Sequence, residues 1–147
     1  MIEPNLNIVR NEYYIVFTQG VTHWITRWLR KSFSHIILMT KDDYNWMILN
    51  PTRLYLQVVI PASPIDKPPL AIITQKGDSV LRIKFKQRND TQQFGCVGLL
   101  NCVTWSKYIL GLRINSLTPW RMYQRLLNFN QSEMERHGII SIEQVQI

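Results

Sequence analysis

The sequence predicts a single α+β domain with a mostly antiparallel sheet and a cysteine-bearing helix packed on it. Runs of β-branched and aromatic residues dominate residues 12–88, whereas helical spacing with clear start signals follows residue 101. Hydrophobic residues make up 46% of the 147 residues, which is enough for one core, and the chain is too short for two. We expect one domain over 1–128 and a C-terminal tail over 129–147.

The charge is distributed unevenly along the chain. Seventeen Lys and Arg against ten Asp and Glu give +7, but residues 129–147 hold three glutamates and one arginine. The tail therefore carries −2 and the body +9. Such a body favours anionic partners, namely nucleic acid, anionic lipid or cell-wall polymer, and solubility explains it equally well.

The sequence disfavours a membrane-spanning protein and a secreted protein. No apolar run approaches the roughly 20 residues that cross a bilayer. The first residues lack the basic and apolar regions of a secretory signal. We therefore expect a protein without a transmembrane segment that is cytoplasmic at synthesis.

Residues 12–88 predict strands with one early helix. The expected strands are 12–19, 33–40, 45–50, 54–60, 70–75 and 79–88, and the expected helix is 22–32. Residues 41–44 have turn chemistry, so 33–50 forms a hairpin, and residues 76–78 are expected to close a second one. Residues 61–69 hold four of the seven prolines and predict a loop.

The remaining residues predict two helices and a short strand. Asn101 is a candidate cap for a helix over 102–112, and Thr118 followed by Pro119 begins a helix over 119–128. Residues 139–142 could form a short edge strand. Little pattern is visible between 129 and 138.

Cations alternate with apolar residues along 79–88. Period two places them on one face of the sheet; they are Arg82, Lys84, Lys86 and Arg88. A solvated outer face is the commoner explanation. The alternative is an anion-binding stripe, in which Arg82, Lys84 and Lys86 contact the substrate.

The thiol of Cys102 is the strongest candidate for a catalytic nucleophile. If Asn101 caps the helix, Cys102 lies on its first turn, where backbone N–H groups and the helix dipole stabilise a thiolate and can bind an oxyanion. His35 is the best candidate base, because an imidazole within an apolar strand is costly to bury without a partner. From residue type alone, a core role for Cys102 is more frequent, and Cys96 is the competing nucleophile.

Three segments resemble a known family. Residues 101–112 (NCVTWSKYILGL) and 118–123 (TPWRMY) resemble the cysteine helix and the following helix of circularly permuted NlpC-type papain-like proteins, and 33–36 (FSHI) resembles the start of their histidine strand. The family includes amidases and peptidases of cell-wall peptides and lipid-directed acyltransferases, and small relatives occur among bacteriophage proteins.

The resemblance implies a role for individual residues. Cys102 would be the nucleophile, His35 the general base and Asn50 the residue that orients the imidazole, with Asn45 as the alternative to Asn50. Trp105, together with Trp46 and Trp120, could line a substrate cleft, although each is more often a core residue.

Two function hypotheses remain open. The first is a cysteine-dependent amide or ester hydrolase acting on peptidoglycan peptides, in a phage particle for example. The second is an inactive papain-like virion protein that contacts other virion proteins, the envelope or nucleic acid. No cofactor or metal is expected, because the three histidines are scattered without metal-binding spacing, and we expect His23 and His137 at the surface.

Overall fold

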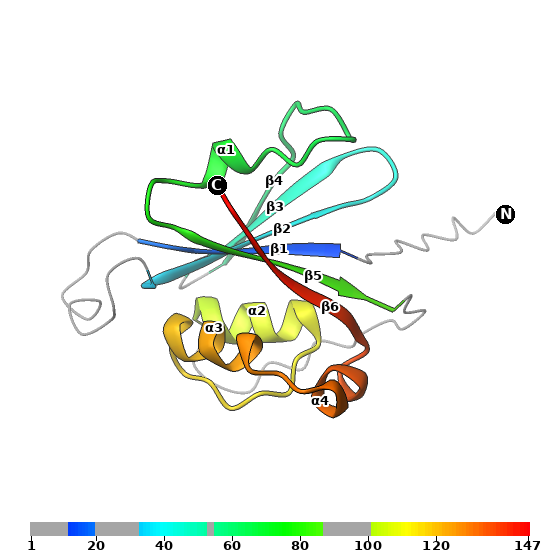
Figure 1. Ribbon diagram of the computed structural model, residues 1–147. Coiled ribbons are helices and arrows are strands. Elements are labelled where there is room, and N and C mark those ends of the chain that lie inside the picture. Colours follow the sequence, from blue (N-terminus) through cyan, green and yellow to red (C-terminus); the bar gives the residue numbers. More distant parts are fainter. Residues whose placement is uncertain (1–11, 20–32, 53–54, 87–100) are drawn as a thin grey trace, which may run out of the picture.

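The computed structural model describes residues 12–19, 33–52, 55–86 and 101–147. These residues form an α+β fold with an antiparallel six-stranded sheet in the order β4-β3-β2-β1-β5-β6, which confirms the predicted fold class (Figure 1). The strands are β1 (Glu12–Thr18), β2 (His35–Lys41), β3 (Trp46–Pro51), β4 (Leu56–Val59), β5 (Ser79–Phe85) and β6 (Ile139–Val145). The helices are α1 (Leu70–Ile73), α2 (Cys102–Leu110), α3 (Pro119–Leu127) and α4 (Gln131–Arg136).

The sheet separates two apolar layers. Helices α2, α3 and α4 lie on one face and α1 on the other (Figure 1). We call the layer under α2 and α3 the helix-side core; its largest buried side chains include Phe17, Leu38, Ile83, Met122 and Leu126. The layer under α1 is the far-side cluster, formed by Tyr14, Val16, Met39, Trp46, Ile48 and Val80. Strand alternation produces this division, because successive side chains leave opposite faces.

The predicted hairpin over 33–50 is confirmed. Strands β2 and β3 pair antiparallel with Leu38 opposite Leu49. Asp42 closes the turn, since its carboxylate accepts hydrogen bonds from the backbone N–H groups of Tyr44 and Asn45 at 2.8 and 2.6 Å. The following strand is shorter than expected, at Leu56–Val59.

The strand predicted over 70–75 is wrong. Leu70–Ile73 forms α1 instead, and the Thr74 N–H and hydroxyl both donate to the Leu70 carbonyl. Pro69 directly precedes this short apolar run, and a proline, which lacks an N–H and has a fixed φ, suits a helix start. An apolar run of this length fits either structure by pattern alone. Gly77 does lie in a turn, with φ 94°, but that turn connects α1 to β5 rather than two strands.

Both predicted late helices are present. Helix α2 ends at Leu110, two residues earlier than expected, because Gly111 adopts the left-handed conformation with φ 66° and caps it. Helix α3 begins at Pro119 after Thr118, whose hydroxyl accepts from the Arg121 N–H. The expected helix over 22–32, together with Cys96, Arg88 and His23, lies outside the described residues.

The tail contains more structure than its pattern indicated. Asn130 and Glu133 form a reciprocal capping box that begins α4, and Ile139–Val145 forms β6. Strand β6 pairs antiparallel with β5 at the edge of the sheet, so the predicted edge strand is confirmed but runs to Val145. The capping signal was readable at Asn130, whereas a helix of six residues shows too few turns for a hydrophobic period.

Candidate functional site

The first turn of α2 holds the Cys102 thiol. The Asn101 side chain accepts a hydrogen bond from the Thr104 N–H at 2.8 Å and so caps the helix as the sequence predicted. Cys102 is the first helical residue, is half-buried and is a free thiol. The backbone N–H groups of a helix start have no partner within the helix; here the Thr104 N–H is used by the cap, and those of Cys102 and Val103 lie near the Cys102 sulfur.

Several backbone groups converge on the Cys102 sulfur. Burial raises the pKa of the thiol, while hydrogen bonds from the backbone of Ile36, Val103 and Cys102 itself lower it. Burial is the larger effect, so the pKa lies above its ordinary value. The resting side chain is therefore a neutral thiol with thiolate-stabilising donors already in position.

Strands β2, β3 and β4 carry a chain of three polar side chains. His35 Nε2 lies 2.7 Å from Asn50 Oδ1, and Asn50 Nδ2 donates to Gln57 Oε1 at 3.2 Å. Because an amide oxygen only accepts, His35 Nε2 carries the proton in this arrangement. Nδ1 then holds the lone pair and is the basic nitrogen of the ring.

The thiol and the imidazole lie on opposite faces of the sheet. Ile36 and Cys102 pack in the helix-side core, whereas Asn50 follows Ile48 of the far-side cluster in the alternation of β3. His35 precedes Ile36 in β2 and leaves the same face as Asn50, whereas the backbone of Ile36 helps to lower the pKa of the thiol on the other face. The sheet therefore separates the Cys102 thiol from the polar chain of His35, Asn50 and Gln57.

Asn50, rather than Asn45, is the asparagine beside His35. Asn45 lies in the turn at the opposite end of the β2–β3 hairpin, where its backbone N–H donates to Asp42. The role implied for Asn50, with Asn45 as its alternative, stays a prediction.

The tryptophans named as cleft candidates lie in three different places. Trp105 is half-buried on α2, and its Nε1 is buried with no hydrogen-bond partner among the described residues. Trp46 belongs to the far-side cluster and donates from Nε1 to the Pro64 carbonyl at 3.0 Å. Trp120 packs edge-on against Phe33 at 4.7 Å between ring centroids. Trp46 is thus separated from Cys102 by the sheet.

The predicted cationic contacts are not beside the thiol. Leu81 and Ile83 face the helix-side core, so Arg82 and Lys84 leave the opposite face of β5. Arg82 is also engaged: its Nε is 2.6 Å from Glu12 Oε1, and its Nη1 is 3.6 Å from Glu143 Oε2. Lys86 is exposed at the end of the strand, where its N–H donates to the Gly138 carbonyl.

The Glu12–Arg82 pair also sets the ionisation of its neighbours. Burial raises the pKa of Glu12, but the hydrogen bonds from Arg82 and Tyr14 outweigh this effect. The pKa of Glu12 therefore lies below its ordinary value. Burial and the hydrogen bond to Glu12 raise the pKa of Tyr14 to about 12. These groups form a structural ion pair on the face of the sheet away from α2.

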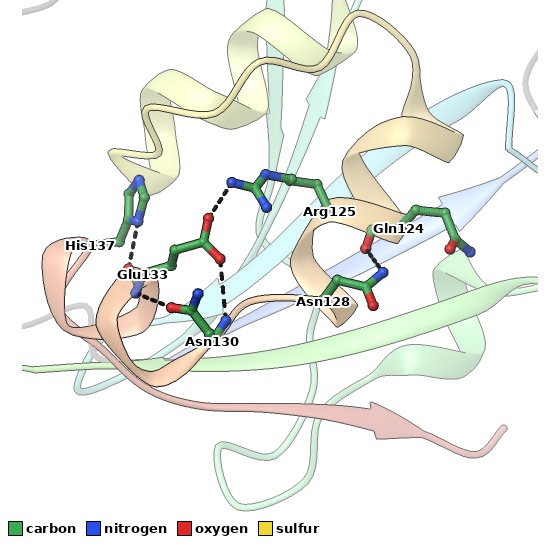
Figure 2. A network of polar contacts seen from close by, with 6 residues as sticks. All are labelled: Gln124, Arg125, Asn128, Asn130, Glu133 and His137. Atoms are coloured by element: carbon green, nitrogen blue, oxygen red, sulfur yellow. Dashed lines mark hydrogen bonds and ion pairs between the residues drawn. The ribbon is translucent and has the colours of Figure 1, made fainter.

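The expected surface position of His137 is wrong. His137 is 6% exposed, and Nδ1 donates to the Glu133 carbonyl at 2.8 Å. Its ring stacks on Phe129 at 5.2 Å. The surrounding polar contacts at the α3–α4 corner are drawn in Figure 2, including the ion pair between Arg125 and Glu133. Sequence reasoning missed this network because it depends on how α4 folds back on α3.

Gln57 is the other residue that sequence reasoning missed. It lies within the predicted strand, but only the pairing of β3 with β4 places it opposite Asn50. Strand register is not readable from a polar residue in a short edge strand. A local sequence signal for Gln57 was therefore absent.

Other kinds of site were also sought in the described residues. No group of three or more His, Cys, Asp and Glu side chains there could hold a metal ion. Of the described helices, none is long and apolar enough to cross a membrane. Two hollows lie elsewhere: one of about 790 Å³ beside the turn at Gly77 and the end of β6, and one of about 260 Å³ between α3, α4 and β6.

Comparison with known proteins adds no assignment to this geometry. No protein-family model, curated protein or solved structure matches the chain.

Proposed function

We propose that the protein is a cysteine-dependent amide or ester hydrolase in which Cys102 is the nucleophile, His35 the general base and Asn50 the residue that orients the imidazole. The observation that supports this most directly is the 2.7 Å contact between His35 Nε2 and Asn50 Oδ1, in a strand whose next residue, Ile36, lowers the pKa of the Cys102 thiol through its backbone. It leaves the basic nitrogen of the ring for the thiol proton.

The proposed reaction follows from these roles. Cys102 Sγ transfers its proton to His35 Nδ1, and the thiolate attacks the substrate carbonyl carbon. Backbone N–H groups at the start of α2 stabilise the oxyanion. His35 then protonates the leaving amine or alcohol, and the acyl group remains on sulfur as a thioester. Water, deprotonated by His35, attacks the thioester, which releases the acid and restores the thiol.

Burial makes the base necessary in this scheme. Because desolvation raises the pKa of the Cys102 thiol, little thiolate forms at neutral pH without a proton acceptor. His35 leaves the face of the sheet away from α2, so the scheme also requires the ring to turn around the beginning of β2 to reach the sulfur. A reactivity of the Cys102 thiol that depends on His35 is therefore the property that separates a catalytic cysteine from a core cysteine.

The substrate is part of the proposal. The family resemblance favours a peptide amide of peptidoglycan, and a phage particle is a setting in which such an activity is used. Recognition through Arg82 and Lys84 receives no support from their position on the opposite face of the sheet. Groups that flank the start of α2, Trp105 among them, are better placed to contact a substrate.

The test is the rate of Cys102 alkylation against pH, resolved by site with mass spectrometry so that Cys96 is counted separately. We expect His35→Ala to slow Cys102 alkylation at pH 7 at least tenfold and to raise the apparent pKa of the thiol. Asn50→Ala should slow it less, and Asn45→Ala, a matched change at the other end of the hairpin, should leave it unchanged. A Cys102 rate indifferent to His35 contradicts the proposal; with His35 dependence established, hydrolysis of cell-wall peptides is the next assay.

One observation favours a second function. Cys102 packs against the helix-side core and its pKa is raised, as expected for a structural thiol. The chain would then be an inactive papain-like binding protein of a virion, contacting other virion proteins, envelope or nucleic acid through its basic surface. In that case Cys102→Ala would leave function intact, and binding to polyanions would weaken as salt is raised.

A further inference from the structure

Strand β4 forms one edge of the described sheet and exposes apolar side chains on both faces. Val58 lies opposite Leu49 of the helix-side core. Val59 lies opposite Ile48 of the far-side cluster. Both valines are exposed, and so is Ile60, which directly follows the strand. The sheet therefore ends, at β4, in an apolar edge rather than in a polar one.

The turn that joins β3 to β4 shows which backbone groups of this edge point outward. The Thr52 N–H donates to the Tyr55 carbonyl at 2.8 Å, so the backbone of Tyr55 faces β3. Backbone groups of successive residues alternate between the two sides of an antiparallel strand. The N–H and C=O groups that point away from β3 therefore belong to Leu56, Val58 and Ile60. They lie on the side of β4 where the described sheet has no further strand.

The opposite edge of the sheet, β6, is protected against pairing in ways that β4 is not. It carries the exposed charge of Glu143, and its register with β5 is interrupted between Lys84 and Phe85. Charges and irregular pairing at an edge disfavour the addition of another strand. Residues 55–60 (YLQVVI), by contrast, hold no charge, proline or glycine. Of the two edges, β4 is therefore the one that can accept a strand.

The outward residues of β4 match a second copy of themselves. If two β4 strands run antiparallel with Val58 opposite Val58, then Leu56 of each copy lies opposite Ile60 of the other. These are the three residues whose backbone groups point outward, so each facing pair can exchange two hydrogen bonds. The facing side chains are all apolar, and no like charges meet, although the whole chain carries +7.

We propose that the free edge of β4 is a self-association surface, on which β4 of a second copy pairs antiparallel about Val58 and joins two six-stranded sheets into one. A two-fold axis passes through the Val58 pair, so the contact closes as a dimer. A single strand pair is a small contact, and association should be weak and depend on concentration. The dimer requires no chemistry at Cys102 and so goes beyond the proposed function.

Val58 is the position at which substitutions test the pairing most directly, because both copies place it at the centre. Val58→Lys sets two cations opposite each other, and the monomer should tolerate it because the side chain is 53% exposed. Val58→Pro removes the outward N–H and leaves the hydrogen bonds to β3 in place. Ile140 of β6 is 58% exposed, so Ile140→Lys adds the same charge at the other edge and is the matched control.

Sedimentation velocity of the full chain, from micromolar to millimolar concentrations, measures the association. We expect the wild type and Ile140→Lys to dimerise equally, and Val58→Lys and Val58→Pro to weaken dimerisation at least about tenfold. Circular dichroism checks that each variant folds. In a wild-type dimer of labelled and unlabelled chains, a nuclear Overhauser effect between the Hα atoms of Gln57 and Val59 reports the register, since the two face each other only between copies.

Each outcome bears on the proposal. A wild type that stays monomeric at every concentration overturns it, as does a dimer that survives both Val58 substitutions. Equal loss of the dimer in Val58→Lys and Ile140→Lys would show that added charge controls association, which also overturns it. The Gln57–Val59 contact tests the wild type directly even if a variant fails to fold, and its absence from the dimer contradicts pairing about Val58.

Discussion

His35 and His137 show two ways in which this fold uses an imidazole. His137 lies at the α3–α4 corner, bonds through Nδ1 to the Glu133 carbonyl of its own helix and stacks on Phe129. His35 bonds to the Asn50 side chain of another strand, on the face of the sheet away from α2. The first arrangement joins the ring to the backbone of its own helix, whereas the second joins side chains of two different strands. The partner of a histidine is thus more informative than its burial.

The largest expected effect is on stability, and it should be larger when the ring of His137 is removed than when the ring of His35 is removed. His137→Ala removes a buried ring and its hydrogen bond, so we expect the free energy of unfolding to fall by about 2 kcal/mol. His35→Ala lies at a half-buried strand start and should cost less than half of that. Urea unfolding measures both.

The same two substitutions should affect the reactivity of Cys102 in the opposite order, with the larger effect in His35→Ala. Alkylation of the thiol should be unchanged in His137→Ala under native conditions, because α4 has no role in the polar chain. A His137→Ala protein that keeps its stability, or one that slows alkylation as strongly as His35→Ala, would break the comparison.

Two helix caps extend the same comparison with a smaller effect. Asn101 caps α2 and Asn130 caps α4, each through its side-chain oxygen. Replacing either by alanine should lower the free energy of unfolding by about 1 kcal/mol. Only Asn101→Ala should also raise the apparent pKa of Cys102, since that thiol lies on the first turn of α2 and uses its N–H groups.

Unfolding curves and alkylation profiles of Asn101→Ala and Asn130→Ala are the measurement. An equal shift of the Cys102 profile in both variants would show that general loosening, and not the start of α2, controls the thiol.

The parts of the site that the sequence predicted are the local ones. Capping at Asn101 needs only three neighbouring residues, and turn chemistry at residues 41–44 predicted the β2–β3 hairpin, whereas the pairing of His35 with Asn50 came from the family resemblance. The short apolar run of α1 was misjudged because a local pattern of that length fits both helix and strand.

The parts that the sequence did not predict depend on strand register and on which face of the sheet each helix covers. Gln57 joins the site only through the pairing of β4 with β3. Arg82 was correctly placed opposite Leu81 and Ile83 in the alternation, but nothing in β5 indicates which face α2 covers. Packing between distant segments decides both, and short-range patterns carry no information on it.

The smallest expected effect concerns Arg82, on the face of the sheet away from α2. Its ion pair holds the pKa of Glu12 below the ordinary value of 4.5, so the pair stabilises the fold above that pH. The contribution is lost as pH falls from about 4.5 through the lowered pKa of Glu12. Both side chains are partly exposed, which limits the contribution to about 1 kcal/mol or less.

Arg82→Met should therefore lower the free energy of unfolding by this amount at pH 7. It should also flatten the decline of that free energy as pH falls below about 4.5, because protonation of one carboxylate, Glu12, no longer breaks an ion pair. Because Arg82 leaves the face opposite the thiol, the alkylation profile of Cys102 should not change. Unfolding in urea at a series of pH values and alkylation at pH 7 measure the two sides of this claim. A slower Cys102 in Arg82→Met would mean that the far face communicates with the thiol through the sheet, and the division between a structural face and a chemical end of the molecule would have to be given up.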